Sequence, residues 1–328
     1  MHFPGKIGSF LKFHQNERPD SLENLNMACY CWFCIQSIVT MKLIVLLILL
    51  TGMTFSFILS TGRDAVPAVE LTNIAYGSSS QQQMDVYLPA NRSESTRTFV
   101  VIHGGAWVRG DKMEMQHMID SLKLRFPDYA FVNLNYRLAA NGITNVFPAQ
   151  ENDVKAAIDF YLGKSSEYNV SKDLVLFGVS AGGHLALLHG YKNDPDKHVK
   201  AIIDGFGPTD LVTTNGGSLR SALSYITGTT YKANPALYQE SSPLFYITPK
   251  SPPTLAMHGG MDGLVAPSQT ESLITKLKEN GVICEQVIYP REGHGWGVPA
   301  LTDSFNKIEV FIRETVKETN GKSGPANL

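Results

Sequence analysis

The sequence predicts an α/β fold in which helices cover both faces of a mostly parallel central sheet. Two observations carry this prediction. Short apolar runs recur along the chain after about residue 66, and most are followed by a longer segment with helical periodicity. Strands and helices that alternate in this way form parallel sheets, because each helix carries the chain back across the sheet. Such sheets place their sites at the carboxyl ends of the strands.

The composition fits one globular domain with little net charge. The chain has 328 residues and is 43% hydrophobic and 18% charged, which is enough to bury one substantial core. Its formal charge is −2 at pH 7, so we expect no nucleic-acid partner. No metal, nucleotide or flavin motif is visible, and we expect no metal site and no cofactor. The sequence leaves the oligomeric state open.

Residues 1–62 are predicted to form a leader. The apolar run 43–59 is shorter than the ~20 residues of a typical membrane span and longer than most signal-peptide cores. Two interpretations stay open: a signal peptide, which would look ordinary if translation began at Met41, and an uncleaved membrane anchor. Both place the domain outside the cytoplasm, either secreted, periplasmic or membrane-anchored. A buried core helix is a third, less favoured interpretation.

Cysteines are unevenly distributed. Cys29, Cys31 and Cys34 lie in the leader, whereas Cys284 is the single cysteine of the predicted domain. One cysteine cannot form a disulfide within the domain, so its core must supply the stability. The N-terminal cluster lacks a second ligand pair at matching spacing, which favours an apolar leader over a zinc site.

Residues 63–328 are predicted to form the catalytic domain. Met84–Leu88 alternates with period two and predicts an early antiparallel strand. Continuous apolar runs, typical of strands covered on both faces, predict the further strands 98–102, 130–134, 174–177, 201–203, 254–257 and 285–289. The predicted helices are 113–124, 151–161, 181–190, 268–280 and 302–317.

Residues 208–250 interrupt the alternation of strands and helices. The interval between the strands near Asp204 and Thr254 is longer than one crossover connection needs. We predict a small lid over the sheet, with a longer helix–loop connection as the alternative.

The segment from Gly178 to Gly182 matches the pattern G-x-S-x-G, with Ser180 at its centre. The pattern alone is weak evidence, but here it directly follows a predicted strand and directly precedes a predicted helix. A serine on such a turn has a strained backbone, and its hydroxyl projects above the sheet beside the positive end of the helix. This setting favours Ser180 as a nucleophile over a structural turn serine.

The segment from His103 to Trp107 reads HGGAW and follows the predicted strand 98–102. Adjacent glycines leave backbone N–H groups free to face a ligand. Gly104 and Gly105, with Ala181 after the serine, would form an oxyanion hole for a tetrahedral intermediate. His103 is expected to hold this loop by hydrogen bonds, and a role as catalytic base is the less favoured alternative.

Five segments in order, HGGAW, NYRLA, GVSAGGH, HGGMDGLV and EGHGW, resemble a known family. They are similar to the carboxylesterases of the hormone-sensitive-lipase and feruloyl-esterase-like (BD-FAE-type) branch of the α/β hydrolases, over roughly residues 80–315. The resemblance implies an α/β-hydrolase fold, a catalytic acid at Asp262 and a catalytic base at His294. Ala106 departs from a frequent third glycine, and Trp296 from a frequent phenylalanine.

Chemistry supports this acid and base. The order Ser, Asp, His is the one that the α/β-hydrolase fold uses, and a carboxylate both fixes the imidazole tautomer and stabilises its charged form. Asp210 also follows a strand and is the rival acid, although a turn or helix cap is favoured. His184 is expected to face the packing side of its helix. The resemblance implies that Arg137 braces the core through a carboxylate.

The predicted function is hydrolysis of short-chain carboxylic esters through an acyl-enzyme on Ser180. The resemblance suggests small-molecule or carbohydrate-linked substrates, including acetyl or feruloyl esters of polysaccharides. Two alternatives stay open: an amide-cleaving hydrolase (an aryl-formamidase or exopeptidase) and a catalytically inactive binding protein. Aromatic residues are predicted to line the substrate pocket, although such residues are more often simple core: Trp107, Phe206, Tyr225, Tyr246 and Trp296.

Overall fold

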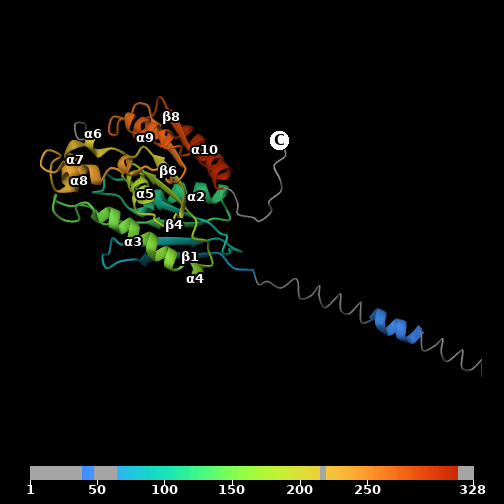
Figure 1. Cartoon of the computed structure of the whole chain (residues 1–328). Coiled ribbons are helices and arrows are strands. Elements are labelled where there is room, and N and C mark those ends of the chain that lie inside the picture. The colour runs from blue at the N-terminus through green and yellow to red at the C-terminus, as the bar shows by residue number, and fades with distance from the viewer. Residues whose placement is uncertain (1–38, 48–64, 215–218, 317–328) are drawn as a thin grey trace, which may run out of the picture. The chain divides into compact units, whose positions relative to one another are not determined.

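The computed structural model describes residues 39–47, 65–214 and 219–316 (Figure 1). The chain divides into two units, Met1–Asp64 and Ala65–Leu328. In the first unit, residues 39–47 form a helix whose side chains are exposed. The rest of the predicted apolar leader and its three cysteines lie outside the described residues. Within the described parts of the chain, no helix is long and apolar enough to cross a membrane.

The second unit is built on an eight-stranded sheet with the strand order β1-β2-β4-β3-β5-β6-β7-β8. β1 pairs antiparallel with β2, β2 pairs antiparallel with β4, and every further neighbour is parallel. The strands are β1 Val69–Ala75, β2 Gln83–Leu88, β3 Thr98–Ile102, β4 Ala130–Leu134, β5 Leu174–Val179, β6 Val199–Gly205, β7 Thr254–Gly259 and β8 Cys284–Tyr289.

All of the predicted strands form, including the early antiparallel one. β1 was not predicted because it is an edge strand whose exposed positions interrupt the apolar pattern. β3, β4 and β5 are buried at nearly every position, as expected for parallel strands covered on both faces.

Helices cover both faces of the sheet (Figure 1), which confirms the predicted α/β class. α3, Ala149–Gly163, α5, Ala181–Lys192, and α9, Ser268–Glu279, contribute to one apolar core. α2, Gln116–Arg125, and α10, Ala300–Thr315, contribute to the core on the other face. Two shorter elements, η1 Lys112–Met115 and α4 Ser165–Tyr168, complete the helices outside the 208–250 region. α5 is buried along almost its whole length, which explains why most of its residues are apolar or glycine.

The predicted lid region contains short helices: α6 Leu211–Thr214, α7 Arg220–Thr227, α8 Pro235–Glu240 and η2 Pro243–Tyr246. Figure 1 shows α6, α7 and α8 gathered at one end of the domain. Leu223, Ile226 and Tyr238 are buried in the core that α3 and α5 share. The region is thus an insertion packed onto the domain, and its action as a lid stays a prediction.

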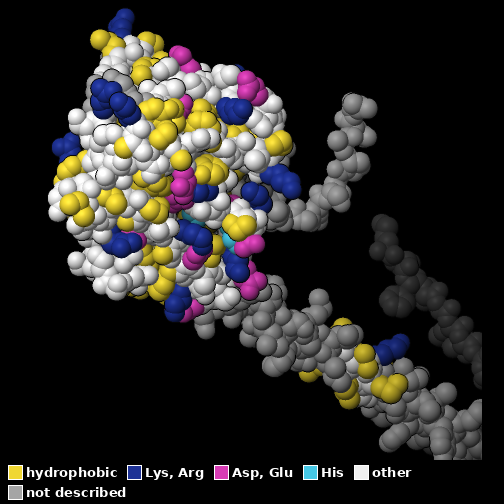
Figure 2. Space-filling view, turned by 60° about the vertical axis from the view of Figure 1, so that its left-hand side comes forward, with side chains coloured by type: hydrophobic (Ala, Val, Ile, Leu, Met, Phe, Trp, Pro, Cys, Tyr) yellow, Lys and Arg dark blue, Asp and Glu magenta, His cyan; other side chains and the backbone are white. Residues whose placement is uncertain are grey.

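The surface fits the weak net charge. On the face shown in Figure 2, lysine and arginine side chains are interspersed with acidic and apolar ones and do not gather into one basic patch.

Candidate active site

Ser180 occupies the sharp turn between β5 and α5. Its backbone is left-handed, with φ 54° and ψ −121°, a conformation that costs about 1–3 kcal/mol for a residue with a side chain. The N–H of Ser180 donates to the carbonyl of Gly205 on β6 (2.7 Å), which holds the turn in place. A Cβ on Gly178 would lie 2.2 Å from the Gly182 oxygen, and one on Gly182 would lie 2.1 Å from the Ile102 oxygen. Both glycines of the motif are therefore sterically required.

The structure brings Ser180, His294 and Asp262 together. Nε2 of His294 lies 2.8 Å from Oγ of Ser180, and Nδ1 lies 2.7 Å from Oδ2 of Asp262. The imidazole side chain is 22% exposed, whereas the carboxylate is fully buried. With the proton on Nδ1 donated to Asp262, Nε2 is free to accept the serine proton. This is the arrangement that an activated serine needs.

The Asp262 carboxylate is surrounded by hydrogen-bond donors. Oδ1 accepts the N–H groups of Leu264 (2.8 Å) and Val265 (2.9 Å), and Oδ2 accepts from His294 and lies 3.2 Å from Nε2 of His258. Burial by itself would raise the pKa of Asp262, but these donors outweigh it and hold the pKa well below its ordinary value. The carboxylate therefore stays ionised beside His294.

The orientation of the HGGAW loop follows from Tyr136. The buried Tyr136 hydroxyl donates to the carbonyl oxygens of His103 (3.1 Å) and Gly104 (3.2 Å). In a trans peptide the N–H points opposite to the carbonyl, so the N–H groups of Gly104 and Gly105 point away from Tyr136. Burial raises the pKa of Tyr136 far above its ordinary value, which keeps the hydroxyl protonated and able to donate.

The predicted oxyanion donors lie next to the serine. A Cβ on Gly104 would come within 3.3 Å of the Ser180 Cβ, so this backbone passes directly beside the nucleophile. Gly105 has φ +104°, a conformation that glycine adopts without strain. Ala181 is the first residue of α5, where N–H groups have no intrahelical acceptor. These N–H groups can together receive a negative oxygen above Ser180.

The rival residues have structural partners. Asp210 accepts the N–H of Val212 (2.9 Å) at the start of α6 and acts as a helix cap. His184 is buried, where Nδ1 accepts from the Trp107 indole (3.2 Å) and Nε2 donates to the Ser241 carbonyl (2.7 Å). His103 bonds the carbonyl of Gly104 through Nδ1 (2.7 Å). Each of these contacts agrees with the structural role that the sequence favoured.

Two of the predicted pocket residues lie beside His294. The Phe206 ring makes an edge contact with the His294 ring (centroids 4.8 Å apart) and with the Trp296 ring (5.1 Å). Trp107 lies apart from these two residues, and its role in a substrate pocket stays a prediction. Its side chain is 2% exposed and packs in the core against His184, because the loop turns through left-handed backbone at Ala106 and Trp107.

The other two aromatic candidates are engaged elsewhere. The Tyr225 hydroxyl accepts the backbone N–H of Asn141. The Tyr246 hydroxyl donates to the Glu240 carbonyl (3.0 Å), and Lys192 lies over its ring. Both residues stabilise the insertion and its neighbours in these contacts.

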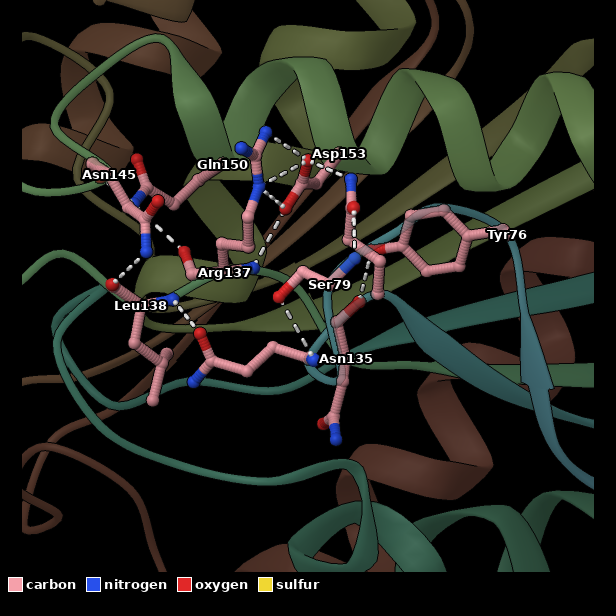
Figure 3. A network of polar contacts seen from close by, with 10 residues as sticks. Tyr76, Ser79, Asn135, Arg137, Leu138, Asn145, Gln150 and Asp153 are labelled. Atoms are coloured by element: carbon pink, nitrogen blue, oxygen red, sulfur yellow. Dashed lines mark hydrogen bonds and ion pairs between the residues drawn. The ribbon is translucent and has the colours of Figure 1, made fainter.

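Arg137 braces the loop that follows β4, as the resemblance implied (Figure 3). Its guanidinium donates to both oxygens of Asp153 on α3, at distances from 2.7 to 3.1 Å. Gln82 donates to the same carboxylate (2.8 Å) from the β1–β2 connection, and Gln150 donates to the Arg137 carbonyl (2.9 Å). The network joins three segments that are distant in sequence.

Two residues of the site had no predicted role. Tyr136 orients the oxyanion loop, and His258 contacts Asp262 from the end of β7. Both lie within the segments that carried the family resemblance, NYRLA and HGGMDGLV. The position of His258, at the end of β7 and four residues before the acid, was the available signal.

Comparison with known proteins agrees with this geometry. The family model BD-FAE matches residues 84–277, more than half of the chain. The chain belongs to the BD-FAE family. The resemblance seen in the sequence is thereby confirmed, and the matched region contains Ser180, Asp262 and the HGGAW loop.

Relatives of this BD-FAE chain include two proteins of Mycobacterium tuberculosis. Esterase LipC is 25% identical over 70% of this chain and 60% of its own length. The probable carboxylic ester hydrolase LipM is 30% identical over 69% of this chain and 56% of its own length. The chain thus spans less than two thirds of these relatives. A truncated carbohydrate esterase from gut microbiota shares the fold, with a TM-score of 0.65, 23% identity and coverage of 78% of this chain and 99% of that one.

Proposed function

We propose that this protein is a serine carboxylesterase that hydrolyses short-chain acyl esters, with carbohydrate-linked esters among its substrates. The observation that carries the proposal is the continuous chain of contacts from Asp262 through His294 to Ser180, beside the Gly104–Gly105 loop. The names of LipC and LipM support ester hydrolysis, and the fold shared with a carbohydrate esterase is consistent with it.

The geometry supports an acyl-enzyme mechanism in two halves. Nε2 of His294 takes the proton of Ser180 while Oγ attacks the ester carbonyl, and the N–H groups of the oxyanion loop and Ala181 receive the negative oxygen. The C–O bond to the alcohol then breaks, and His294 passes its proton to the departing oxygen. In the second half His294 deprotonates water, which attacks the acyl carbonyl, and the proton returns to Oγ as the acid leaves.

Replacement of the nucleophile tests the proposal. The full chain should release nitrophenol from p-nitrophenyl acetate, and Ser180→Ala should lower kcat on the order of a million-fold, as is typical for a triad nucleophile. Ser121→Ala, at a partly exposed serine on α2, is the matched control and should keep the parent rate. Equal turnover by Ser180→Ala and the parent would exclude the mechanism. Faster cleavage of formanilide than of phenyl acetate would favour the amide-cleaving alternative.

We also propose that the domain works outside the cytoplasm. The support is the apolar run 43–59 and the basic Lys42 before it, a pattern typical of signal peptides and anchors. N-terminal sequencing of the protein from fractionated cells measures this. A chain with an intact Met1 in the cytosolic fraction would contradict it.

A further inference from the structure

An apolar cavity of about 100 Å³ is lined in part by the residues that flank Ser180 and His294 in the chain. Val179, directly before Ser180, and Gly205, whose carbonyl holds the Ser180 N–H, form part of its wall. Gly295 and Trp296, directly after His294, form another part. The cavity is therefore walled by the chain neighbours of both reacting residues and by Phe206, whose ring contacts His294, on the face of the sheet that α2 and α10 cover.

The lining is suited to hydrocarbon. Phe177, Met257 and Leu301 contribute apolar side chains. The hydroxyl of Ser304, which also lines the cavity, is occupied: it accepts the Trp296 indole N–H (2.7 Å) and bonds the Tyr289 hydroxyl and the Ala300 carbonyl. A sugar, with several hydroxyl groups to satisfy, would lose its hydrogen bonds to water there without replacement.

Phe206 fixes the boundary between the cavity and His294. Its backbone has φ 49°, which is unusual for a bulky residue and persists only where surrounding structure enforces it. The N–H of Phe206 donates to the Met257 carbonyl (2.8 Å), and the ring is held between His294 and Trp296. Strained backbone of this kind is concentrated at functional sites.

The volume limits what the cavity can hold. An apolar cavity of about 150 Å³ accommodates benzene, and a water-sized group fills ~30 Å³ of liquid. A cavity of about 100 Å³ is smaller than the one that accommodates benzene and large enough for about three methylene-sized groups, so its volume favours a short unbranched chain over an aromatic ring.

We propose that this cavity is the acyl pocket, an inference that rests on the proposed function. The pocket selects unbranched aliphatic acyl groups from acetyl to butyryl over feruloyl and longer chains. The acyl group stays bonded to Ser180 until water releases it, so its pocket must be close to the serine. This cavity is lined by Val179, which precedes Ser180, and by Gly205, which binds the Ser180 N–H. A carbohydrate alcohol is too large and too polar for the cavity and lies outside it.

A chain-length series tests the pocket. The substrates are p-nitrophenyl esters from acetate to octanoate. The full chain should give its highest kcat/KM with acyl chains of two to four carbons and at least a tenfold lower kcat/KM with eight carbons. The kcat/KM for a feruloyl ester should be as low as that for octanoate. Leu301→Ala and Met118→Ala, which each enlarge the cavity, should raise the hexanoate-to-acetate ratio of kcat/KM about tenfold, the usual effect of a methylene-scale change in an apolar pocket. Leu301→Trp should lower the butyrate-to-acetate ratio.

Controls separate this pocket from the esterase proposal. Leu124→Ala removes a leucine that is 84% exposed and does not line the cavity, and its ratios should equal those of the parent. Ser180-dependent turnover that is equal for acetate, octanoate and ferulate would overturn the pocket and leave the esterase standing. Alkyl acetates share one acyl group and differ only in the alcohol. If Leu301→Ala changes the relative rates within that series but not within the acyl series, the cavity binds the alcohol and the acyl assignment is overturned. No Ser180-dependent turnover of any ester would end both proposals.

Discussion

Asp262 and Asp204 are buried carboxyl groups at or just beyond the carboxyl ends of two neighbouring strands, β7 and β6, yet their pKa values shift in opposite directions. Asp262 receives four donors, and its pKa falls well below the ordinary value. Asp204 receives one, the Gly207 N–H (3.0 Å), and its Oδ2 has no partner among the described residues. Burial raises the pKa of Asp204 to about 7, against the smaller opposing effects of His258 and the Gly207 N–H. The balance between desolvation, which is stronger at Asp204, and hydrogen-bond donors, which are more numerous at Asp262, decides which carboxyl is ionised.

The space around Asp204 shows that its position is specific. A Cβ on Gly183 would lie 2.2 Å from its Oδ1, and one on Gly207 would lie 2.5 Å away. The carboxyl fits only because both neighbours are glycines. The difference between the two aspartates therefore predicts a catalytic role for Asp262 and a pH-dependent cost in stability for Asp204.

Removal of the charge at Asp262 should give the largest effect in this comparison. Asp262→Asn should lower kcat by about 10⁴-fold, because the amide no longer fixes the productive imidazole tautomer. Asp210→Asn, at the helix cap, should retain most of the activity. Steady-state kinetics with p-nitrophenyl acetate measures both, and a greater loss in Asp210→Asn would reassign the acid.

Loss of one donor to Asp262 should give an intermediate effect. His258 is fully buried, its Nδ1 accepts from the Thr270 hydroxyl (2.7 Å), and its Nε2 faces Asp262 and the Val265 carbonyl. His258→Leu should lower kcat about 10- to 100-fold with little change in KM, since a hydrogen bond to a charged group contributes ~1.5–3 kcal/mol.

The conservative variant distinguishes positioning from packing. His258→Gln keeps an N–H donor and should recover part of the lost kcat. If the Gln and Leu variants lose the same activity and the same thermal stability, His258 acts only by filling space.

Neutralisation of Asp204 should give the smallest effect of the three, and the quantity that changes should be the stability of the folded protein. The pKa of Asp204 in the folded protein, about 7, lies above its ordinary value of 3.8, so the folded state is favoured at low pH and loses stability as pH rises through 7. Asp204→Asn removes this loss. Its Tm should exceed that of the parent by several degrees at pH 8, at ~2–4 °C per kcal/mol for a domain of this size, and by much less at pH 4.

Thermal unfolding at the two pH values measures this difference. Asp196→Asn, at an exposed aspartate, is the control and should show no pH-dependent gain. A gain of equal size at pH 4 and pH 8 would mean that the effect of Asp204→Asn is not ionisation.

Much of the site could be predicted because its signals are local. The glycines around Ser180 are required by contacts within one turn and the strand beside it, so the motif and its setting are sufficient to locate the nucleophile. The contacts of Trp107 could not be predicted, because the direction of its side chain depends on left-handed backbone at two non-glycine residues, which residue type does not reveal. β1 was missed because an exposed edge strand has little apolar pattern.

The sequence by itself determined the α/β class, the order of the buried strands, and the motifs on which the proposed acyl transfer rests, because periodicity and short motifs encode them within a few residues. Only the tertiary structure decided that Asp262 is stabilised as an anion while Asp204 is not, that Tyr136 orients the oxyanion loop, and that a small apolar cavity is lined in part by the chain neighbours of Ser180. These features depend on the distances between segments far apart in the chain, which are set by strand order and side-chain packing.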